Sequence, residues 1–145
     1  MKVSTKGRYA LRMMVDFALY NTGEVVSLRE VAARQEISMK YMEQIVSMLT
    51  KAGLLRSTRG PQGGYRLARR PEEYTVEEIL TATEGSLAPV ACLENDTNNC
   101  QRAGSCATLS FWEELYRINR EFMQKTTLKT LVDAEREKNG WEYSI

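Results

Sequence analysis

The 145-residue sequence contains no histidine. Without an imidazole it has no Ser-His or Cys-His pair for nucleophilic catalysis, and its acids follow the pattern of exposed helix faces. No apolar run approaches the roughly 18 to 20 residues of a membrane span, and the amino terminus, MKVSTKGRYALRMM, lacks the apolar core of a signal peptide. We therefore expect a cytoplasmic protein that is not an enzyme, has no small-molecule substrate and binds no membrane.

Cysteine is scarce, and its three copies lie close together. Cys92, Cys100 and Cys106 share one polar stretch, ACLENDTNNCQRAGSCATL. In a reducing cytoplasm, clustered thiols indicate metal or redox chemistry before a structural disulfide. A flexible polar loop lets three thiolates converge on an iron-sulfur cluster. The alternatives are three free thiols without a role, or a redox disulfide between Cys100 and Cys106.

The net charge of +1 conceals two oppositely charged halves. Residues 1–70 carry thirteen Lys and Arg against five Asp and Glu, a balance of +8, whereas residues 71–145 carry seven against fourteen, a balance of −7. A basic half beside an acidic half is typical of a phosphate-binding head joined to a body that faces solvent or a partner. Chance segregation on a solvated surface is the simpler alternative.

Helical periodicity dominates the first fifty residues. A first helix is expected from Ser4 to about Tyr20, and capping signals at Ser27 and Ser38 begin two shorter helices, the second of which stops before Gly53. The last of these helices buries Met42, Ile45, Val46 and Leu49. Two short helices with a tight connection form a helix-turn-helix.

The periodicity then becomes alternating. Residues 55–59 and 65–67 flank a glycine-rich turn at Gly60–Gly64, which predicts a β-hairpin bearing several arginines. The glycines do not form a phosphate-binding P-loop, because Tyr-Arg-Leu follows them instead of a Lys-Ser/Thr pair and a helix.

Three more helices complete the expected fold. A capping box at Thr75 and Glu78 begins a short helix that Gly85 closes, and a long helix and a final helix follow the cysteines. The long helix has an apolar face formed by Phe111, Trp112, Leu115, Ile118 and Phe122. We predict a mostly α fold with a small β-hairpin wing: a winged helix-turn-helix domain over residues 1–84, a cysteine loop over 85–108, and a dimerisation helix with a C-terminal helix over 109–145.

A helix-turn-helix followed by a hairpin is the element order of a winged helix, whose second helix enters the major groove of DNA. Here the residues at the start of that helix are Ser38, Met39, Lys40, Tyr41, Glu43 and Gln44. Lys40 suits guanine or phosphate, Gln44 adenine, and Glu43 the amino group of cytosine. A merely solvated helix face is the alternative, which the hairpin and the basic balance of the same half disfavour.

The predicted hairpin adds further DNA contacts. Arg59 at the tip, with Gly60 beside it, is placed to enter a minor groove. The residues placed to meet phosphates are Arg56, Arg66, Arg69 and Arg70.

Four runs together resemble the Rrf2 family of bacterial winged-helix regulators, most closely its IscR-type and RirA-type members: KVSTKGRYALRMM, ISMKYMEQIVSMLTKAGL, RGPQGGYRLAR, and C-x7-C-x5-C followed by FW. The likeness extends from Met1 to about Val132. It implies a homodimer that binds palindromic operators. The two subunits are joined by their long helices, which cross, and the interface contains Trp112, Leu115, Ile118 and Phe122. It also implies that the three cysteines hold an iron-sulfur cluster that controls DNA affinity. The regulator would be a repressor or an activator of transcription.

The fourth cluster ligand departs from the family pattern. Members with a two-iron cluster usually place a histidine where this chain has Leu109. Some relatives take an acidic ligand from the partner's first helix, but residues 6–12 are basic or neutral and the nearest carboxylate is Asp16. Besides water or a small molecule, the candidates are Glu94, Asp96 and Thr108. We expect a labile cluster, of the [2Fe-2S] type before the [4Fe-4S] type.

Three functions follow from these patterns. The first is a dimeric DNA-binding regulator that senses cluster, iron or redox status through Cys92, Cys100 and Cys106. The second keeps the DNA-binding head without a cluster and is controlled by thiol oxidation or a protein partner, as in cysteine-metabolism regulators. The third is a cluster carrier or electron-transfer protein whose basic head docks an acidic partner.

Overall fold

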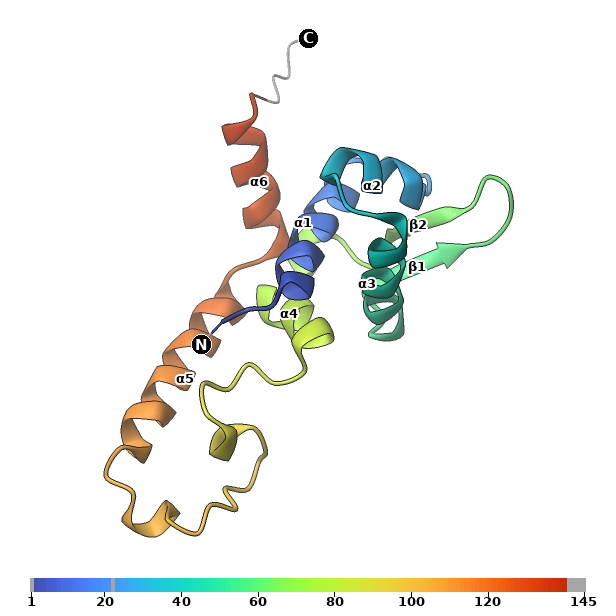
Figure 1. Ribbon diagram of the computed structural model, residues 1–145. Helices are drawn as coiled ribbons and strands as arrows, with labels where there is room; N and C mark the ends of the chain where they lie inside the picture. Colours follow the sequence, from blue (N-terminus) through green and yellow to red (C-terminus); the bar gives the residue numbers. More distant parts are fainter. Residues whose placement is uncertain (1, 22, 141–145) are drawn as a thin grey trace.

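The computed structural model describes residues 2–21 and 23–140 (Figure 1). In chain order its helices and strands are α1 (Thr5–Leu19), α2 (Leu28–Gln35), α3 (Met39–Lys51), β1 (Leu55–Thr58), β2 (Gly64–Leu67), α4 (Val76–Glu84), α5 (Leu109–Lys125) and α6 (Leu128–Lys138). Short 3₁₀ turns form at η1 (Pro71–Glu73), η2 (Ala91–Leu93) and η3 (Ala103–Ser105). The mostly helical fold with a two-stranded wing confirms the predicted fold class.

The helices begin where the sequence places capping side chains. Ser4, Ser27, Ser38 and Thr75 each accept a hydrogen bond from the backbone N–H three residues further on. Each such bond satisfies one of the N–H groups that the start of a helix leaves open. At the end of α3, Gly53 takes a left-handed φ of +77°, as predicted for a glycine that ends a helix.

One hydrophobic core joins α1, α2, α3, α4, α6 and the wing. α3 buries the four predicted side chains, Met42, Ile45, Val46 and Leu49. Leu128 and Val132 are buried as well, and α6 packs against α1. An apolar stripe shows that one face of a helix is covered but not which element covers it, so the return of α6 to the head was not predicted.

The wing is fixed to the segment that precedes α2. β1 and β2 pair antiparallel, with Leu55 opposite Leu67. Val26 and Tyr65 exchange two backbone hydrogen bonds of 2.8 and 2.9 Å. Gly64 permits this approach, because a Cβ there would lie 2.4 Å from the Val26 carbonyl oxygen. The hairpin therefore keeps a defined position relative to the helix-turn-helix.

Tyr74 closes the base of the wing from inside the core. Its buried hydroxyl donates to the Leu54 carbonyl at 2.7 Å and accepts from the N–H groups of Ala68 and Arg69 at 2.8 and 3.0 Å. Burial raises the pKa of Tyr74, so the hydroxyl keeps the proton that it donates. One side chain thus holds the chain on both sides of the hairpin.

The cysteine loop lies at the far end of α5 from the head (Figure 1). The carboxyl end of α5 returns to the head, where the Val76 N–H donates to the Thr126 carbonyl at 2.9 Å and the Leu128 N–H donates to the Tyr74 carbonyl at 3.1 Å. Within residues 2–21 and 23–140, none of the helices combines the length and the apolar character that crossing a membrane requires.

Candidate DNA-binding surface and cysteine loop

The outer face of α3 carries three of the residues predicted to read bases. Lys40, Glu43 and Gln44 are exposed, while Met42 and Ile45 of the same helix are fully buried. This division gives α3 one face for the core and one polar face with donors and acceptors. The exposed face has the chemistry needed for major-groove contacts.

Two other residues predicted at the start of this helix, Ser38 and Tyr41, have structural contacts as well. Ser38 is the N-cap of α3, and its hydroxyl accepts from the Tyr41 N–H at 3.3 Å. The Tyr41 ring is half-buried and packs edge-on against Tyr9 of α1, with ring centroids 5.7 Å apart. Both residues therefore fix the start of α3 in addition to lying at its surface.

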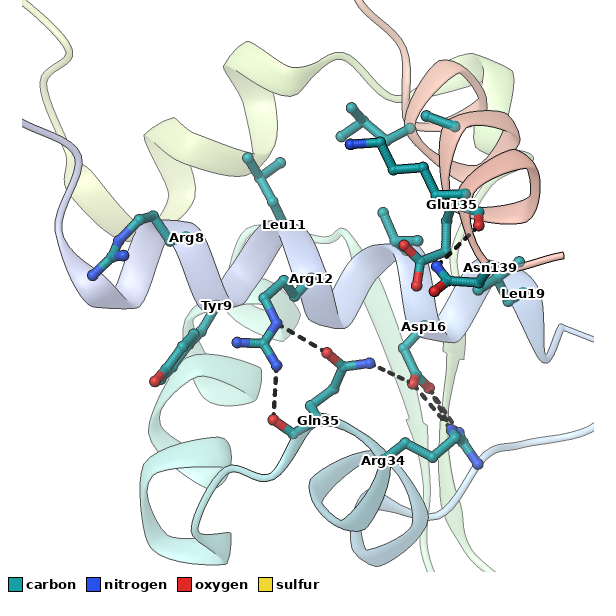
Figure 2. A pocket seen from close by; sticks show the side chains of 14 residues that line it. Arg8, Tyr9, Leu11, Arg12, Asp16, Leu19, Arg34, Gln35, Glu135 and Asn139 are labelled. Carbon is teal, nitrogen blue, oxygen red and sulfur yellow. Dashed lines mark hydrogen bonds and ion pairs between the residues drawn. The ribbon is translucent and has the colours of Figure 1, made fainter. Parts of the chain in front are cut away.

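A polar network from α1 holds the turn between α2 and α3 (Figure 2). Arg12 donates to the side-chain oxygen of Gln35 at 3.0 Å and to its carbonyl at 2.8 Å. The Gln35 amide donates to Asp16 at 2.9 Å, and Asp16, only 2% exposed, accepts three further bonds from Arg34 at 3.2, 3.0 and 2.7 Å. Glu36 follows with φ +55° and turns the chain toward α3. The position of α3 thus depends on α1.

No local pattern in the sequence indicates this network. Its partners lie 18 to 23 positions apart, beyond the three or four positions that link neighbours on one helix. Asp16 offered one indirect signal, because it stands on the apolar stripe of a helix, where a carboxylate needs a partner.

The wing presents three exposed arginines. Arg56, Arg59 and Arg66 are exposed, and none of them forms an ion pair within the described part of the chain. Arg69 instead pairs with Glu78 at 2.8 Å, and Arg70 lies 3.5 Å from the nearest carboxylate oxygens of both Glu72 and Glu73. Arg69, which we expected to meet phosphates, is therefore held at the base of the wing by Glu78, whereas the Arg70 side chain remains 75% exposed.

The tip of the wing is a tight glycine turn. Arg59 and Gly60 follow β1 directly, and Gly60 adopts φ +111°, which favours glycine. A Cβ on Gly63 would lie 2.1 Å from the Thr58 carbonyl oxygen. The turn thus requires glycine at two positions and leaves Arg59 exposed.

The three cysteines lie on the irregular loop between α4 and α5. All three are free thiols; Cys92 is half-buried in η2, and Cys100 and Cys106 are exposed. Among the described residues, no three His, Cys, Asp or Glu side chains are close enough to hold a metal ion. Three thiols are nevertheless the donor set that iron-sulfur clusters use, and η2 and η3 are the loop's only regular turns in the described residues. The chemistry of these three donors, carried by one loop, fits an iron-sulfur cluster.

Thr108 tunes the thiol of Cys106. The Cys106 sulfur lies 3.4 Å from the Thr108 hydroxyl. Hydrogen bonding from the Thr108 side chain, and then from its backbone N–H, lowers the pKa of the Cys106 thiol. A thiolate is both the metal ligand and the nucleophile, so Cys106 is prepared for either chemistry.

The candidate fourth ligands differ in accessibility. Glu94 and Asp96 are exposed and line a polar groove of about 360 Å³ between the loop, α4 and α5. The Thr108 hydroxyl is already bonded to Cys106. Asp16 is buried by Arg34 and Gln35, so this carboxylate is not available to a cluster in a partner subunit.

The apolar face predicted on the long helix remains uncovered. Phe111, Ile118 and Phe122 are 60%, 49% and 71% exposed, while Trp112 and Leu115 are half-buried. Large apolar side chains in a row on one helix face indicate a protein interface.

Comparison with known proteins identifies the family. A family model described as Rrf2, iron-dependent transcriptional regulator, matches residues 3–134. The chain belongs to the Rrf2 family. It is 38% identical to the HTH-type transcriptional regulator IscR of Aliivibrio salmonicida, over 93% of this chain and 80% of that protein.

Two solved structures of Rrf2-type regulators resemble the fold closely. CymR (YrzC), the global cysteine regulator of B. subtilis, matches with a TM-score of 0.75 and 33% identity over 92% of this chain and 98% of that chain. IscR of T. potens matches with a TM-score of 0.74 and 35% identity over 95% of this chain and 90% of that chain. Members of the Rrf2 family are DNA-binding transcriptional regulators and not enzymes, so the chain is a transcriptional regulator of this family.

Proposed function

We propose that this Rrf2-family regulator is a cytoplasmic homodimer that reads a palindromic operator and senses iron-sulfur cluster, iron or redox status through Cys92, Cys100 and Cys106. One observation carries the proposal. A single chain combines an exposed polar face on α3, unpaired wing arginines and three free thiols on a loop at the far end of α5.

In this proposal the DNA-reading residues are Ser38, Lys40, Tyr41, Glu43, Gln44, Arg59 and Gly60. The exposed side chains of α3 contact base edges in the major groove, and Arg59 enters the neighbouring minor groove beside Gly60 at the turn of the wing. Arg56 and Arg66 neutralise phosphates, which makes binding dependent on salt. Two copies related by a twofold axis bind the two halves of a palindrome.

The cysteine loop supplies the sensor. Cys92, Cys100 and Cys106 hold an iron-sulfur cluster, and Glu94, Asp96 or water completes the ligand set. When bound, the cluster supplies a centre that can be gained, lost or oxidised. The exposure of Cys100 and Cys106 gives iron, sulfide and oxidants access to the ligands.

A path of contacts links the loop to the recognition helix. Glu84, the last residue of α4 before the loop, accepts hydrogen bonds from the backbone N–H of Ser4, at 3.0 Å, and from the Ser4 hydroxyl. Ser4 caps α1, and α1 holds the turn before α3 through Arg12 and Asp16. Ordering the loop can therefore change the position of α3. This mechanism requires that the cluster bind one of the two conformations more tightly than the other, and that the two conformations differ in DNA affinity.

The cluster is tested on protein purified without oxygen. The visible absorption spectrum is recorded, and iron and acid-labile sulfide are assayed on the same sample and on Cys92→Ala. We expect a coloured protein with matched iron and sulfide that loses its colour in the variant. A colourless protein that resists reconstitution would exclude the cluster and leave the DNA-binding regulator.

The second candidate is a regulator controlled by thiol oxidation or a partner protein. It is favoured by the lowered pKa of the exposed Cys106 thiol and by the likeness to a cysteine regulator, CymR. A disulfide between Cys100 and Cys106 that changes DNA affinity in cluster-free protein would support it.

A further inference from the structure

The two strands of the wing place two arginines directly opposite each other. The antiparallel register pairs Arg56 of β1 with Arg66 of β2, and both residues are exposed. Successive side chains of a strand point to opposite faces, and the adjacent Leu55 and Leu67 are buried. This arginine pair, Arg56 and Arg66, therefore lies on the outer face of the hairpin, which points away from the core.

The arginine pair has no acidic neighbour on the outer face of the hairpin. The positions two residues along the chain from either arginine, on the same face, hold Leu54, Thr58, Gly64 and Ala68. Within residues 2–21 and 23–140, neither arginine of the pair forms an ion pair. Like charges directly opposite each other destabilise a sheet. The outer face of the wing thus carries an unfavourable interaction that a bound anion would remove.

The arginines at the base of the wing do have acidic neighbours. The Arg69 guanidinium lies 2.8 Å from a carboxylate oxygen of Glu78. The Arg70 guanidinium lies 3.5 Å from carboxylate oxygens of both Glu72 and Glu73. The chain therefore supplies carboxylates to the arginines at the base and none to the arginine pair, which leaves the pair available to an anion from outside the chain.

The geometry of two opposed arginines suits a single phosphate group. Residues directly opposite each other on an antiparallel pair have Cβ atoms about 5 Å apart, so both guanidinium groups can approach one anion. A guanidinium donates two parallel N–H bonds to phosphate oxygens, and each phosphodiester of DNA has two non-bridging oxygens that accept them. One phosphodiester therefore satisfies both arginines.

The distance to the tip of the wing places the arginine pair beside the DNA backbone. Arg56 precedes Arg59 by three residues, which is about 10 Å along an extended chain. The minor groove is only about 7.5 Å deep. When the hairpin inserts tip first, the pair consequently remains outside the groove that Arg59 enters, next to the phosphates that border it.

We propose that Arg56 and Arg66 together bind one phosphate of the DNA backbone at the rim of the minor groove that Arg59 enters. The inference rests on the DNA-binding wing of the proposed function and deepens it, because it assigns both arginines to one shared phosphate. Binding replaces the repulsion between two cations with the attraction of both to one anion. The two arginines therefore act as a unit that depends on a single phosphate.

Neutral substitutions in the DNA backbone locate this phosphate. The wild-type protein selects a duplex from a random pool, and methylphosphonate then replaces one phosphate at a time in both half-sites. Among the positions where wild-type affinity falls at least about tenfold, we expect one at which Arg56→Gln and Arg66→Gln each abolish most of the loss. Fluorescence anisotropy measures the affinities. Different positions for the two variants, or no such position for either, would overturn the shared site.

Salt dependence gives a second test with a matched control. Each contacted phosphate contributes about 0.9 to the slope of log K against log salt concentration. The double variant Arg56→Gln with Arg66→Gln should lower that slope by about 0.9 per protomer, whereas two separate phosphates predict about 1.8. Lys129→Gln removes a charge from the exposed face of α6 and should leave the slope unchanged.

Failure of the shared site is distinguishable from failure of the proposed function. A wild-type protein that selects no preferred duplex would contradict the DNA-binding function itself. A wild-type complex whose slope falls by about 1.8 per protomer in the double variant would overturn only the shared phosphate. A slope that the double variant leaves unchanged would show that the arginine pair meets no phosphate, and it would overturn the inference as well.

Discussion

At the residue scale, a few side chains with distant partners hold the DNA-reading elements in place. Tyr74 joins both ends of the hairpin from within the core, and Asp16 joins α1 to the end of α2. Each is buried and fully engaged in hydrogen bonds, which is the condition under which a buried polar group stabilises a fold.

The hydroxyl of Tyr74 is predicted to stabilise the wing. Tyr74→Phe leaves the Leu54 carbonyl and the Ala68 and Arg69 N–H groups without this partner, so the free energy of unfolding should fall by about 1–3 kcal/mol. Urea denaturation followed by circular dichroism measures the change. The control is Tyr65→Phe, at a half-buried ring of β2, where we expect a change within about 0.5 kcal/mol. Equal losses in both variants would contradict this role.

The second residue-scale prediction concerns pH. The lowered pKa of Cys106 means that its thiolate forms at a lower pH than that of a thiol without these hydrogen bonds. Alkylation of Cys106 in cluster-free protein should therefore reach half its maximal rate at a lower pH than alkylation of such a thiol. Thr108→Val removes the hydroxyl hydrogen bond and should move the profile to higher pH, as measured by mass spectrometry of Cys106-containing peptides. A profile that Thr108→Val leaves in place would show that Thr108 does not set the reactivity.

At the element scale, the wing tip depends on glycine. Gly63→Ala brings a Cβ within 2.1 Å of the Thr58 carbonyl and 2.9 Å of the Gly60 carbonyl, and since both atoms are backbone the turn must distort. We expect affinity for a selected operator to fall at least about tenfold, because Arg59 is displaced. Thr81→Ala, at an exposed position of α4 outside the wing and the cysteine loop, should leave affinity unchanged. Fluorescence anisotropy at fixed salt measures both, and a Gly63→Ala affinity equal to that of the control would exclude the wing from DNA binding.

Local signals in the sequence account for most of the elements. The caps at Ser4, Ser27, Ser38 and Thr75 act over three residues, and the hairpin follows from alternation around glycine, so each is visible in a short window. The packing of α6 on α1 and the pairing of Arg69 with Glu78 depend on contacts that form only when the chain folds. For that reason the final helix was predicted and the element against which it packs was not.

Some features of the candidate sites could likewise be predicted from local sequence patterns, and others could not. The exposed face of α3 follows from helical periodicity, because the buried residues fix the opposite side. Two features could not be predicted and were found only in the structure. They are the contacts of Arg69 and Arg70 with acidic side chains, and the network from Arg12 to Asp16. The cysteines were found by composition, but their arrangement around a cluster depends on a loop that has little regular structure of its own.

At the scale of the whole molecule, the basic and acidic halves of the chain form different parts of the structure. The basic half forms the head with α3 and the wing, and the acidic half includes α4, the cysteine loop, α5 and α6. The apolar face of α5 lies uncovered between head and loop. In the proposed homodimer this face joins two heads, and the state of the cysteine loop determines how the two recognition helices meet DNA.

The measurement that tests this account most directly is the affinity of one selected operator for protein with and without its cluster, at the same salt and without oxygen. The account predicts that the two Kd values differ by at least about tenfold, equivalent to about 1.4 kcal/mol of coupling, and that Cys92→Ala binds like the cluster-free form. Equal Kd values for the two forms on every selected operator would contradict sensing through the cysteine loop.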